Sequence, residues 1–286
     1  MTDKVKYLIK TLLRLLFPRK HREIIYWLGD LKAMLKPRPN EVNLVYWVLR
    51  QNPASRAMVD VGAHFGTTLK RFAEDGWQVY AFEPDPQNRA RLEDFAREFH
   101  NVTIDTRAVS NEIKTDQPFY RSEVSSGISG LSSFHPSHQE AEKVSTVTLY
   151  QYCLDEHIDA IDFLKVDTEG YDLLVLKGVP WDRLKPRFII CEFEDRKTVP
   201  LGYSIHDMAK YLTDHGYRVL VSEWFPVVEY GGDHKWRTFA EYPTELQGGE
   251  QACGNLIAAL DQREFKKLNK VCRRYRFMAK LRGILR

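Results

Sequence analysis

The chain has 286 residues, of which 43% are apolar and 28% are charged, a composition typical of a globular protein. It excludes an intrinsically disordered chain, a collagen-like repeat and a small scaffold held by disulfides. The net charge of +3 conceals an asymmetry, because residues 1–40 carry a net +7 and residues 262–286 a net +9, which leaves −13 for residues 41–261. Basic ends on an acidic middle predict that the ends bind an anionic partner or dock on the acidic body.

The apolar stretches are too short for a membrane span, which needs about 18 uninterrupted apolar residues. The N-terminal run LIKTLLRLLF is interrupted by Lys10 and Arg14, so it is not typical of a signal peptide either. We therefore expect a cytoplasmic protein, whose basic ends are candidates for peripheral contact with the inner face of the membrane. Four cysteines without a CxxC pair predict reduced, structural thiols: Cys153, Cys191, Cys253 and Cys272.

Residues 1–55 are predicted to form a helical extension. The segment 1–17 has lysines and an arginine between apolar residues at helical spacing, which predicts a basic amphipathic helix: Val5, Leu8, Ile9, Leu12 and Leu16. Pro18 ends this pattern. A second helical pattern covers 24–35 and stops before Pro37 and Pro39.

Residues 56–261 alternate between apolar runs and helical patterns, as in a parallel α/β sheet. Seven strands are predicted, at 57–61, 78–82, 102–106, 161–166, 188–192, 218–222 and 255–259. Helices are expected near 67–75, 86–99, 171–177 and 205–215. Two β-like pieces, 118–122 and 144–149, flank a Ser/Gly-rich segment at 125–133 that is expected to be a mobile loop.

Residues 262–286 are predicted to be a separate basic helix, with apolar residues at helical spacing among many lysines and arginines: Phe265, Leu268, Cys272, Tyr275 and Ala279. The two basic ends have two alternative roles. If they face an anionic membrane, deletion of residues 263–286 leaves the melting temperature nearly unchanged. If they pack on the core, the same deletion lowers it.

The sequence DVGAHFG, Asp60 to Gly66, follows the first predicted strand and precedes a helix. A glycine turn at this place in an α/β sheet receives a nucleotide, because glycine permits a tight turn and a close approach of the backbone to the ligand. The spacing is not the GxGxxG of dinucleotide folds, and Asp60 would repel a pyrophosphate. A ligand with a positively charged amine is favoured, near Gly62, Ala63 and Gly66.

The sequence AFEPDP brings Glu83 and Pro84 to the end of the second predicted strand. From there a carboxylate can accept hydrogen bonds from both hydroxyls of a ribose. The alternative is that Glu83 and Asp85 only begin a helix, where carboxylates favour the helix dipole. Asp105, at the end of the third predicted strand, completes the candidate cofactor-binding residues.

The segment 161–178, IDFLKVDTEGYDLLVLKG, predicts a strand that ends at Asp167, followed by Glu169 and a short helix. Carboxylates at the carboxyl end of a central strand face the crevice where open α/β sheets bind ligands. Alternatively, Asp167 or Thr168 caps the helix and Glu169 lies in its first turn. The next strand, in FIICEFED, ends near Glu192, which lies either in the crevice or at the surface.

In this order, DVGAHFG, AFEPDP, KVDTEGYDLLVLKG and FIICEFED resemble the FkbM family of S-adenosylmethionine-dependent methyltransferases, over residues 56–260. The family usually has asparagine at the position of His64, and D-V-E-G-A-E where this chain has Thr168, Tyr171 and Asp172. The resemblance implies a Rossmann-like class I methyltransferase fold, with a seven-stranded, mostly parallel sheet, and S-adenosylmethionine as the cofactor. It also implies methylation of a hydroxyl group, on a sugar, glycan or glycolipid or on a polyketide or other natural product.

Methyl transfer to an alcohol needs a general base within hydrogen-bond reach of the hydroxyl. Glu169 is the candidate base, and Asp167 is expected to hold the amino group of the cofactor or the acceptor hydroxyl. His64 is a second candidate base. No metal is predicted, although a divalent cation held by Asp167, Glu169 and Glu192 stays an alternative.

Two other functions compete with methyl transfer. One is a nicotinamide-dependent oxidoreductase on the same βαβ scaffold, although GxGxxG and a Tyr-x-x-x-Lys pair are missing. The other is a non-catalytic, membrane-associated binding module. Nucleic acid is not an expected partner, because the middle of the chain is acidic. Acceptor specificity is expected in the loops 107–143, where His135 and His138 line the acceptor or lie at the surface, and 224–251.

Overall fold

The computed structural model describes residues 38–226 and 234–281, together with the single residues 11, 16 and 24. The helices expected at 1–17 and 24–35 therefore lie outside the described residues, apart from those three positions. No helix in the described part of the chain is both long enough and apolar enough to cross a membrane. The division into domains and the cytoplasmic location stay predictions.

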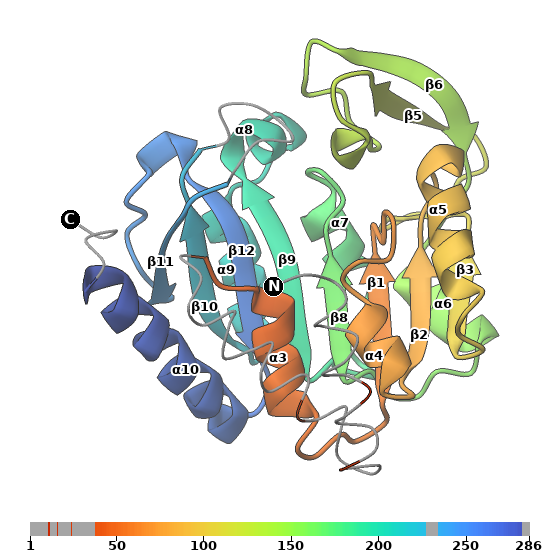
Figure 1. The fold of residues 1–286 in the computed structure, drawn as a ribbon. Coiled ribbons are helices and arrows are strands. Elements are labelled where there is room, and N and C mark those ends of the chain that lie inside the picture. Colours follow the sequence, from red (N-terminus) through yellow and green to blue (C-terminus); the bar gives the residue numbers. More distant parts are fainter. Residues whose placement is uncertain (1–10, 12–15, 17–23, 25–37, 227–233, 282–286) are drawn as a thin grey trace.

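A central sheet of eight strands forms the middle layer (Figure 1). Five strands run parallel in the order β3 (Val102–Asp105), β2 (Gln78–Phe82), β1 (Ala57–Val61), β8 (Phe163–Val166) and β9 (Phe188–Glu194). The sheet continues through β12 (Cys253–Ala259), which is antiparallel to β9 and to β10 (Arg218–Trp224), and ends at β11 (Trp236–Glu241). All seven predicted strands are present, and the Rossmann-like class I methyltransferase fold is confirmed.

The expected number of strands is wrong by one, because β11 adds an eighth strand at the edge of the sheet. It pairs antiparallel with β10 and lies within the segment 224–251, which was expected to be a loop. Trp236 and Phe239 of β11 are buried, and the Phe239 ring lies 6.5 Å from the ring of Tyr275 on helix α10 (Gln262–Leu281). A helix from the far end of the chain therefore covers this strand.

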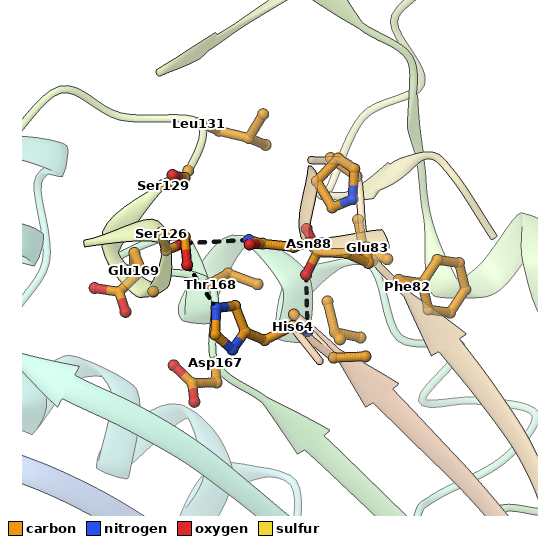
Figure 2. A pocket seen from close by; sticks show the side chains of 18 of the residues that line it. His64, Phe82, Glu83, Asn88, Ser126, Ser129, Leu131, Asp167, Thr168 and Glu169 are labelled. Atoms are coloured by element: carbon orange, nitrogen blue, oxygen red, sulfur yellow. Dashed lines mark hydrogen bonds between the residues drawn. The ribbon is translucent and has the colours of Figure 1, made fainter. Parts of the chain in front are cut away.

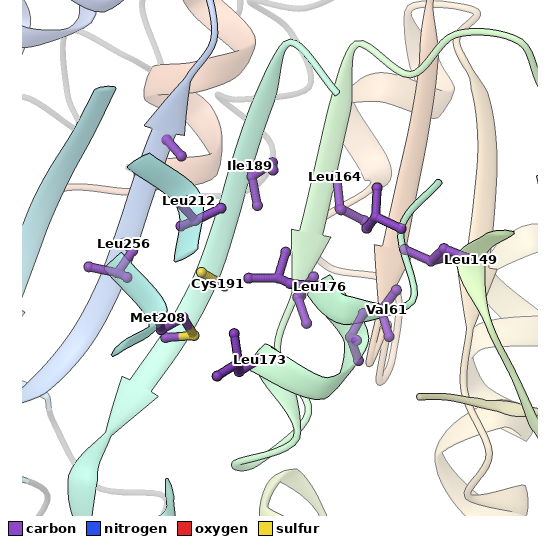
Figure 3. Packing of buried hydrophobic residues seen from close by; sticks show 14 of the residues in the cluster. Val61, Leu149, Leu164, Leu173, Leu176, Ile189, Cys191, Met208, Leu212 and Leu256 are labelled. Atoms are coloured by element: carbon purple, nitrogen blue, oxygen red, sulfur yellow. The ribbon is translucent and has the colours of Figure 1, made fainter. Parts of the chain in front are cut away.

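Helices cover both faces of the sheet. One face packs against α3 (Glu41–Leu49), α4 (Lys70–Glu74), α5 (Pro86–Ala96) and α10. The other packs against α6 (Leu149–Asp155), α7 (Asp172–Lys177) and α9 (Ile205–Asp214), and Figure 3 shows this second core. The short elements α8 (Asp195–Thr198), η2 (Val199–Leu201) and η3 (Gly249–Gln251) lie in connections. The four helices predicted within 56–261 are present, α3 lies in the predicted helical extension 1–55, and α6 and α8 were not predicted. All four cysteines are free and buried.

Two small sheets lie between β3 and β8. Strand β4 (Ala108–Val109) pairs with β7 (Thr146–Val147), and β5 (Gln117–Ser122) pairs with β6 (His138–Val144). The expected strand piece at 118–122 is confirmed within β5. The piece at 144–149 is too long, because Leu149 already begins α6. The side chain of Thr148 caps that helix by accepting a hydrogen bond from Gln151 N–H at 3.1 Å.

Asp85 caps helix α5, in agreement with the helix-start alternative for this residue. Its side chain accepts a hydrogen bond from Gln87 N–H at 2.8 Å, and Pro86 occupies the first helical position. Glu83 does not cap the helix. The two carboxylates of the AFEPDP motif therefore have different roles: Asp85 caps α5, and Glu83 is free of that role.

Helix α10 packs its apolar side against the sheet and against α3. The buried side chains are those that the helical spacing predicted: Phe265, Leu268, Cys272 and Tyr275. The structure agrees with the alternative in which residues 263–286 pack on the core, and contact with an anionic membrane stays a prediction. Deletion of residues 263–286 would uncover the core and is expected to lower the melting temperature.

The docking of α10 can be tested with Leu268→Ala. We expect this change to lower the free energy of unfolding by about 2–5 kcal/mol, because it leaves a cavity in a packed core. Urea denaturation measures the loss. The control is Lys266→Ala at an exposed site of the same helix, for which a change within about 0.5 kcal/mol is expected. Equal losses from both variants would contradict the docked helix.

Candidate active site

A cavity of about 230 Å³ lies at the carboxyl ends of β1, β2 and β8 (Figure 2). Its lining includes seven of the predicted site residues: Gly62, Ala63, His64, Glu83, Pro84, Asp167 and Glu169. The connection between β5 and β6 lines the cavity from the other side with residues of the segment 126–131, which we call the roof. Three predicted residues do not line the cavity: Asp60, Gly66 and Asp105.

At Gly62, the turn after β1 lies directly against the backbone of Asp167 at the end of β8. This glycine has a φ of +78°, and a Cβ atom added to it would lie 1.9 Å from the carbonyl oxygen of Asp167, so no side chain fits. Gly66 has a φ of +77°, and its Cβ would lie 2.8 Å from the side chains of Leu92 and Phe95 on α5. Gly62 thus allows the carboxyl ends of β1 and β8 to lie close together. Gly66 allows the turn to pack closely against α5.

The backbone orients the carboxylate of Glu83. Its Oε2 accepts a hydrogen bond from His64 N–H at 2.8 Å, and its Oε1 accepts one from Asp85 N–H at 2.9 Å. Glu83 is only 5% exposed. Burial raises the pKa of Glu83 to about 7, although the two backbone hydrogen bonds oppose this shift. Because each carboxylate oxygen has two lone pairs, Glu83 can still accept two further hydrogen bonds.

Lys165, a buried lysine that the sequence analysis missed, links two carboxylates beside the cavity. Its Nζ lies 3.3 Å from Asp60 Oδ1 and 3.2 Å from Asp167 Oδ2. The Thr68 hydroxyl donates to Asp60 Oδ2 at 2.5 Å. Burial raises the pKa of Asp60, although Lys165 opposes the shift. Asp60 therefore supports the site through Lys165 and does not face the cavity. The sequence signal for this pair is a lysine inside the otherwise apolar strand F-L-K-V.

Asp167 and Asp105 differ in what their carboxylates can reach. Asp167 is partly exposed and lines the cavity. Burial favours its protonated form, but Lys165 and Lys197 hold the pKa of Asp167 below its usual range. The carboxylate of Asp105 instead binds the guanidinium of Arg107 at 2.6 Å and accepts the Arg107 N–H at 2.8 Å. Asp105 is therefore not brought to the cavity.

Two side chains of the cavity wall bind the roof at Ser126. Asn88 Nδ2 donates to the Ser126 carbonyl at 3.1 Å, and His64 Nε2 lies 3.1 Å from the Ser126 hydroxyl. The roof contains the 3-10 helix η1 (Ser126–Ile128). The segment 125–133, expected to be a mobile loop, is thus held in place by specific contacts. Burial lowers the pKa of His64, so its ring is neutral at pH 7.

The lining leaves polar atoms for a polar ligand. Among the described residues, Asn88 Oδ1 and Ser129 Oγ are buried without a hydrogen-bond partner, and both residues line the cavity (Figure 2). Buried polar groups of this kind need a partner from a ligand or water. With the Glu83 carboxylate, they provide acceptors and a hydroxyl for a nucleoside, and Asp167 offers a negative charge for an amino group. These residues therefore fit an adenosyl cofactor with a charged amine.

Lys197 of α8, also missed from the sequence, collects three carboxylates around one ammonium group. Its Nζ lies 2.6 Å from Glu169 Oε2 and 3.0 Å from both Glu192 Oε2 and Glu194 Oε2. Glu169 has a φ of +56°, a backbone conformation that side chains rarely adopt and that concentrates at functional sites. Burial raises the pKa of Glu169 to about 7, and Lys197 opposes this shift.

A second cavity, of about 370 Å³, adjoins the first and shares Glu169 and Gly127 with it. Most of the residues that line it are polar or charged. They include Arg38, Ser125, Glu192, Glu194, Lys197, His234 and Asn255, and the tryptophan Trp224 also lines the cavity. Glu192 thus lies in the crevice, as one of its two alternatives predicted. His135 and His138 line neither cavity and contact other residues of the β5–β6 connection.

The carboxylates considered for a metal do come together. Oxygen atoms of Asp167, Glu169 and Glu192 lie within 4.8 Å of one another. The Lys197 ammonium already lies beside two of them. It provides there the positive charge that a divalent cation would bring.

Comparisons with known proteins concern sequence and fold. The family model of the methyltransferase FkbM domain matches residues 60–219. No curated protein matches the sequence. A precorrin-6y C5,15-methyltransferase from Geobacter metallireducens has 16% identity, with 76% of this chain and 86% of that chain covered and a TM-score of 0.39. A magnesium protoporphyrin IX methyltransferase from Synechocystis, solved with bound S-adenosylhomocysteine, has 13% identity, 77% and 82% coverage and a TM-score of 0.39.

The link between Lys165 and its carboxylates predicts a large effect of Lys165→Met. We expect a loss of about 3–5 kcal/mol in the free energy of unfolding, because the buried Asp60 carboxyl group would lose its cation and would have to keep an unpaired charge or take up a proton. Chemical denaturation measures this loss. In the double variant Lys165→Met, Asp60→Asn the charge is gone, and much of the stability should return. If the double variant is no more stable than the single one, the two residues are not coupled.

Proposed function

The chain belongs to the FkbM methyltransferase family, and we propose that this S-adenosylmethionine-dependent methyltransferase transfers the methyl group to a hydroxyl group of a sugar, glycan or natural product. The observation that carries the proposal is the place of Glu169, a carboxylate that lines both cavities. In this proposal the first cavity holds the cofactor and the second receives the acceptor.

In the cofactor half of the proposal, several residues that line the first cavity each bind a particular part of S-adenosylmethionine. When bound, S-adenosylmethionine supplies a methyl group on a positively charged sulfur. Glu83 accepts hydrogen bonds from the ribose hydroxyls, and Asp167 binds the amino group. The backbone at Gly62 and Ala63 lies against the ligand. The main support is that Glu83 is already oriented by two backbone N–H groups, so little ordering is needed on binding.

The acceptor half of the proposal makes Glu169 the general base. Lys197 binds Oε2 of Glu169 at 2.6 Å, and in the described part of the chain Oε1 has no hydrogen bond of its own. Oε1 can therefore accept the proton of the acceptor hydroxyl, and Lys197 stabilises the carboxylate before that step. A pKa of about 7 for Glu169 suits a base that works near neutral pH. His64 is a weaker candidate, because its ring contacts Ser126 of the roof.

The function is tested by incubating the protein with S-adenosylmethionine labelled in the methyl group and separated sugar, glycolipid and natural-product fractions. Label is expected in a methyl ether, which survives mild alkali. Label in an alkali-labile ester, in a methylated amine or in nucleic acid would contradict transfer to a hydroxyl group.

Cofactor binding is tested with Glu83→Ala. We expect the variant to bind S-adenosylhomocysteine more weakly by about 1.5–3 kcal/mol, the contribution of charge-assisted hydrogen bonds. Calorimetry measures the affinity at several pH values. In the native protein, affinity should rise from about pH 6 to about pH 8, as a carboxyl group with a pKa of about 7 ionises and becomes a better acceptor. The variant should lose this dependence, and the exposed Glu98→Ala should keep it. Unchanged affinity in Glu83→Ala would reject the assignment.

Catalysis is tested with Glu169→Gln on the acceptor that the labelling identifies. Turnover should fall by about 10²–10⁴, because the amide cannot take the proton, while the affinity for S-adenosylhomocysteine changes little. In the native protein kcat should rise with pH through about 7, since only the ionised Glu169 acts as a base. The charged groups that influence this carboxylate are Lys197, Asp167, Asp172 and Glu192. The variant should lack this rise.

The exposed Glu140→Gln serves as the control for general effects of losing one carboxylate. If Glu169→Gln turns over like the native protein and this control, Glu169 has a structural role only.

A further inference from the structure

One side of helix α10 presents cations to the outside of the molecule. The exposed side chains recur every three or four residues, and we call them the basic face: Arg263, Lys266, Lys267, Lys270, Arg273 and Arg274. Residues at this spacing share one side of a helix, and from the first to the last they extend over about 16 Å. Figure 1 shows α10, in dark blue, beside α3 at the flank of the molecule that is distant from β1, β2 and β3.

The basic face is not neutralised by the body that carries it. Glu264 is the single acidic residue of α10, and it pairs with Arg187. None of the six cations forms an ion pair with a carboxylate of the described residues. Like charges three or four positions apart repel one another on a helix, so the basic face does not serve the stability of α10. Although residues 41–261 carry a net −13, the helix docks through its apolar side and turns its cations away.

We propose that the basic face binds an anionic phospholipid bilayer. An array of cations on the outer side of one straight helix can meet a flat anionic surface together. Each lysine or arginine close to such a surface strengthens binding about fivefold. The apolar side of α10 is buried in the core, where Leu268 and Cys272 lie. The helix therefore lies along the headgroups with its apolar side still in the core, and the attachment is mainly electrostatic and reversible. This inference does not depend on the proposed acceptor.

A lipid surface is favoured over nucleic acid by an apolar residue near the cations. Phe277, on α10 itself and at helical spacing from Arg273 and Arg274, is 62% exposed. Large apolar side chains beside lysines and arginines fit the boundary between headgroups and acyl chains. The phosphate backbone of a duplex offers them no comparable contact.

The test is sedimentation of the full chain with vesicles of phosphatidylcholine mixed with phosphatidylglycerol, and with vesicles of phosphatidylcholine alone. The triple variant Lys266→Gln, Lys267→Gln, Lys270→Gln should bind the anionic vesicles about 100-fold more weakly than the native chain, as the loss of three cations implies. The control Lys114→Gln, Lys143→Gln, Lys177→Gln removes the same charge from exposed sites elsewhere and should bind almost as the native chain does. Both variants should keep the native melting temperature.

Several results would overturn the proposal. One is that the native chain does not bind the anionic vesicles, or binds phosphatidylcholine equally well. Binding that resists high salt would replace electrostatic attachment by insertion. If the α10 variant binds as the native chain does, the N-terminal segment or another surface is responsible. If the control loses as much affinity, only total charge matters. Tighter binding of the native chain to duplex DNA or RNA than to the vesicles would point to nucleic acid.

Discussion

Two buried lysine ammonium groups hold the carboxylates at the carboxyl edge of the sheet. Lys165 joins Asp60 to Asp167, and Lys197 joins Glu169 to Glu192 and Glu194. Without a nearby cation, buried carboxyl groups this close together would take up protons and lose their charge. The ammonium groups oppose this uptake of protons, and they tie together carboxylates that come from different elements around the two cavities.

The parts of the site that the sequence predicts are those set by strand ends. Glu83, Asp167 and Glu169 each follow a short apolar run, and the carboxyl ends of parallel strands meet at one edge of a sheet. The two lysines could not be assigned, because each has one partner that is distant in the sequence, Asp60 for Lys165 and Glu169 for Lys197, which only folding brings close. Asp105 does not reach the cavity for a local reason, since the guanidinium of Arg107, two residues later, donates to both of its carboxylate oxygens.

The elements of the fold also differ in whether neighbouring residues or distant ones determine them. The seven predicted strands are apolar runs whose identity is visible in the sequence. Strand β11 is not such a run, and its burial depends on α10, from the end of the chain. The helical spacing in 262–286 predicts both the helix and its apolar side, but it does not say what covers that side. Amphipathic pattern alone is equally compatible with a protein core and with a lipid surface.

The close contact at Gly62 limits which substitutions the first cavity tolerates. A side chain there would collide with the Asp167 backbone, so the joined ends of β1 and β8 tolerate little variation. The roof is attached to the cavity wall by contacts of the His64 and Asn88 side chains with Ser126. Other pairs of side chains can replace such contacts. The joined strand ends therefore fix one wall of the cavity proposed to bind the cofactor, whereas the roof, which lines the first cavity and touches the second through Gly127 and Ile128, is the wall that substitutions can reshape.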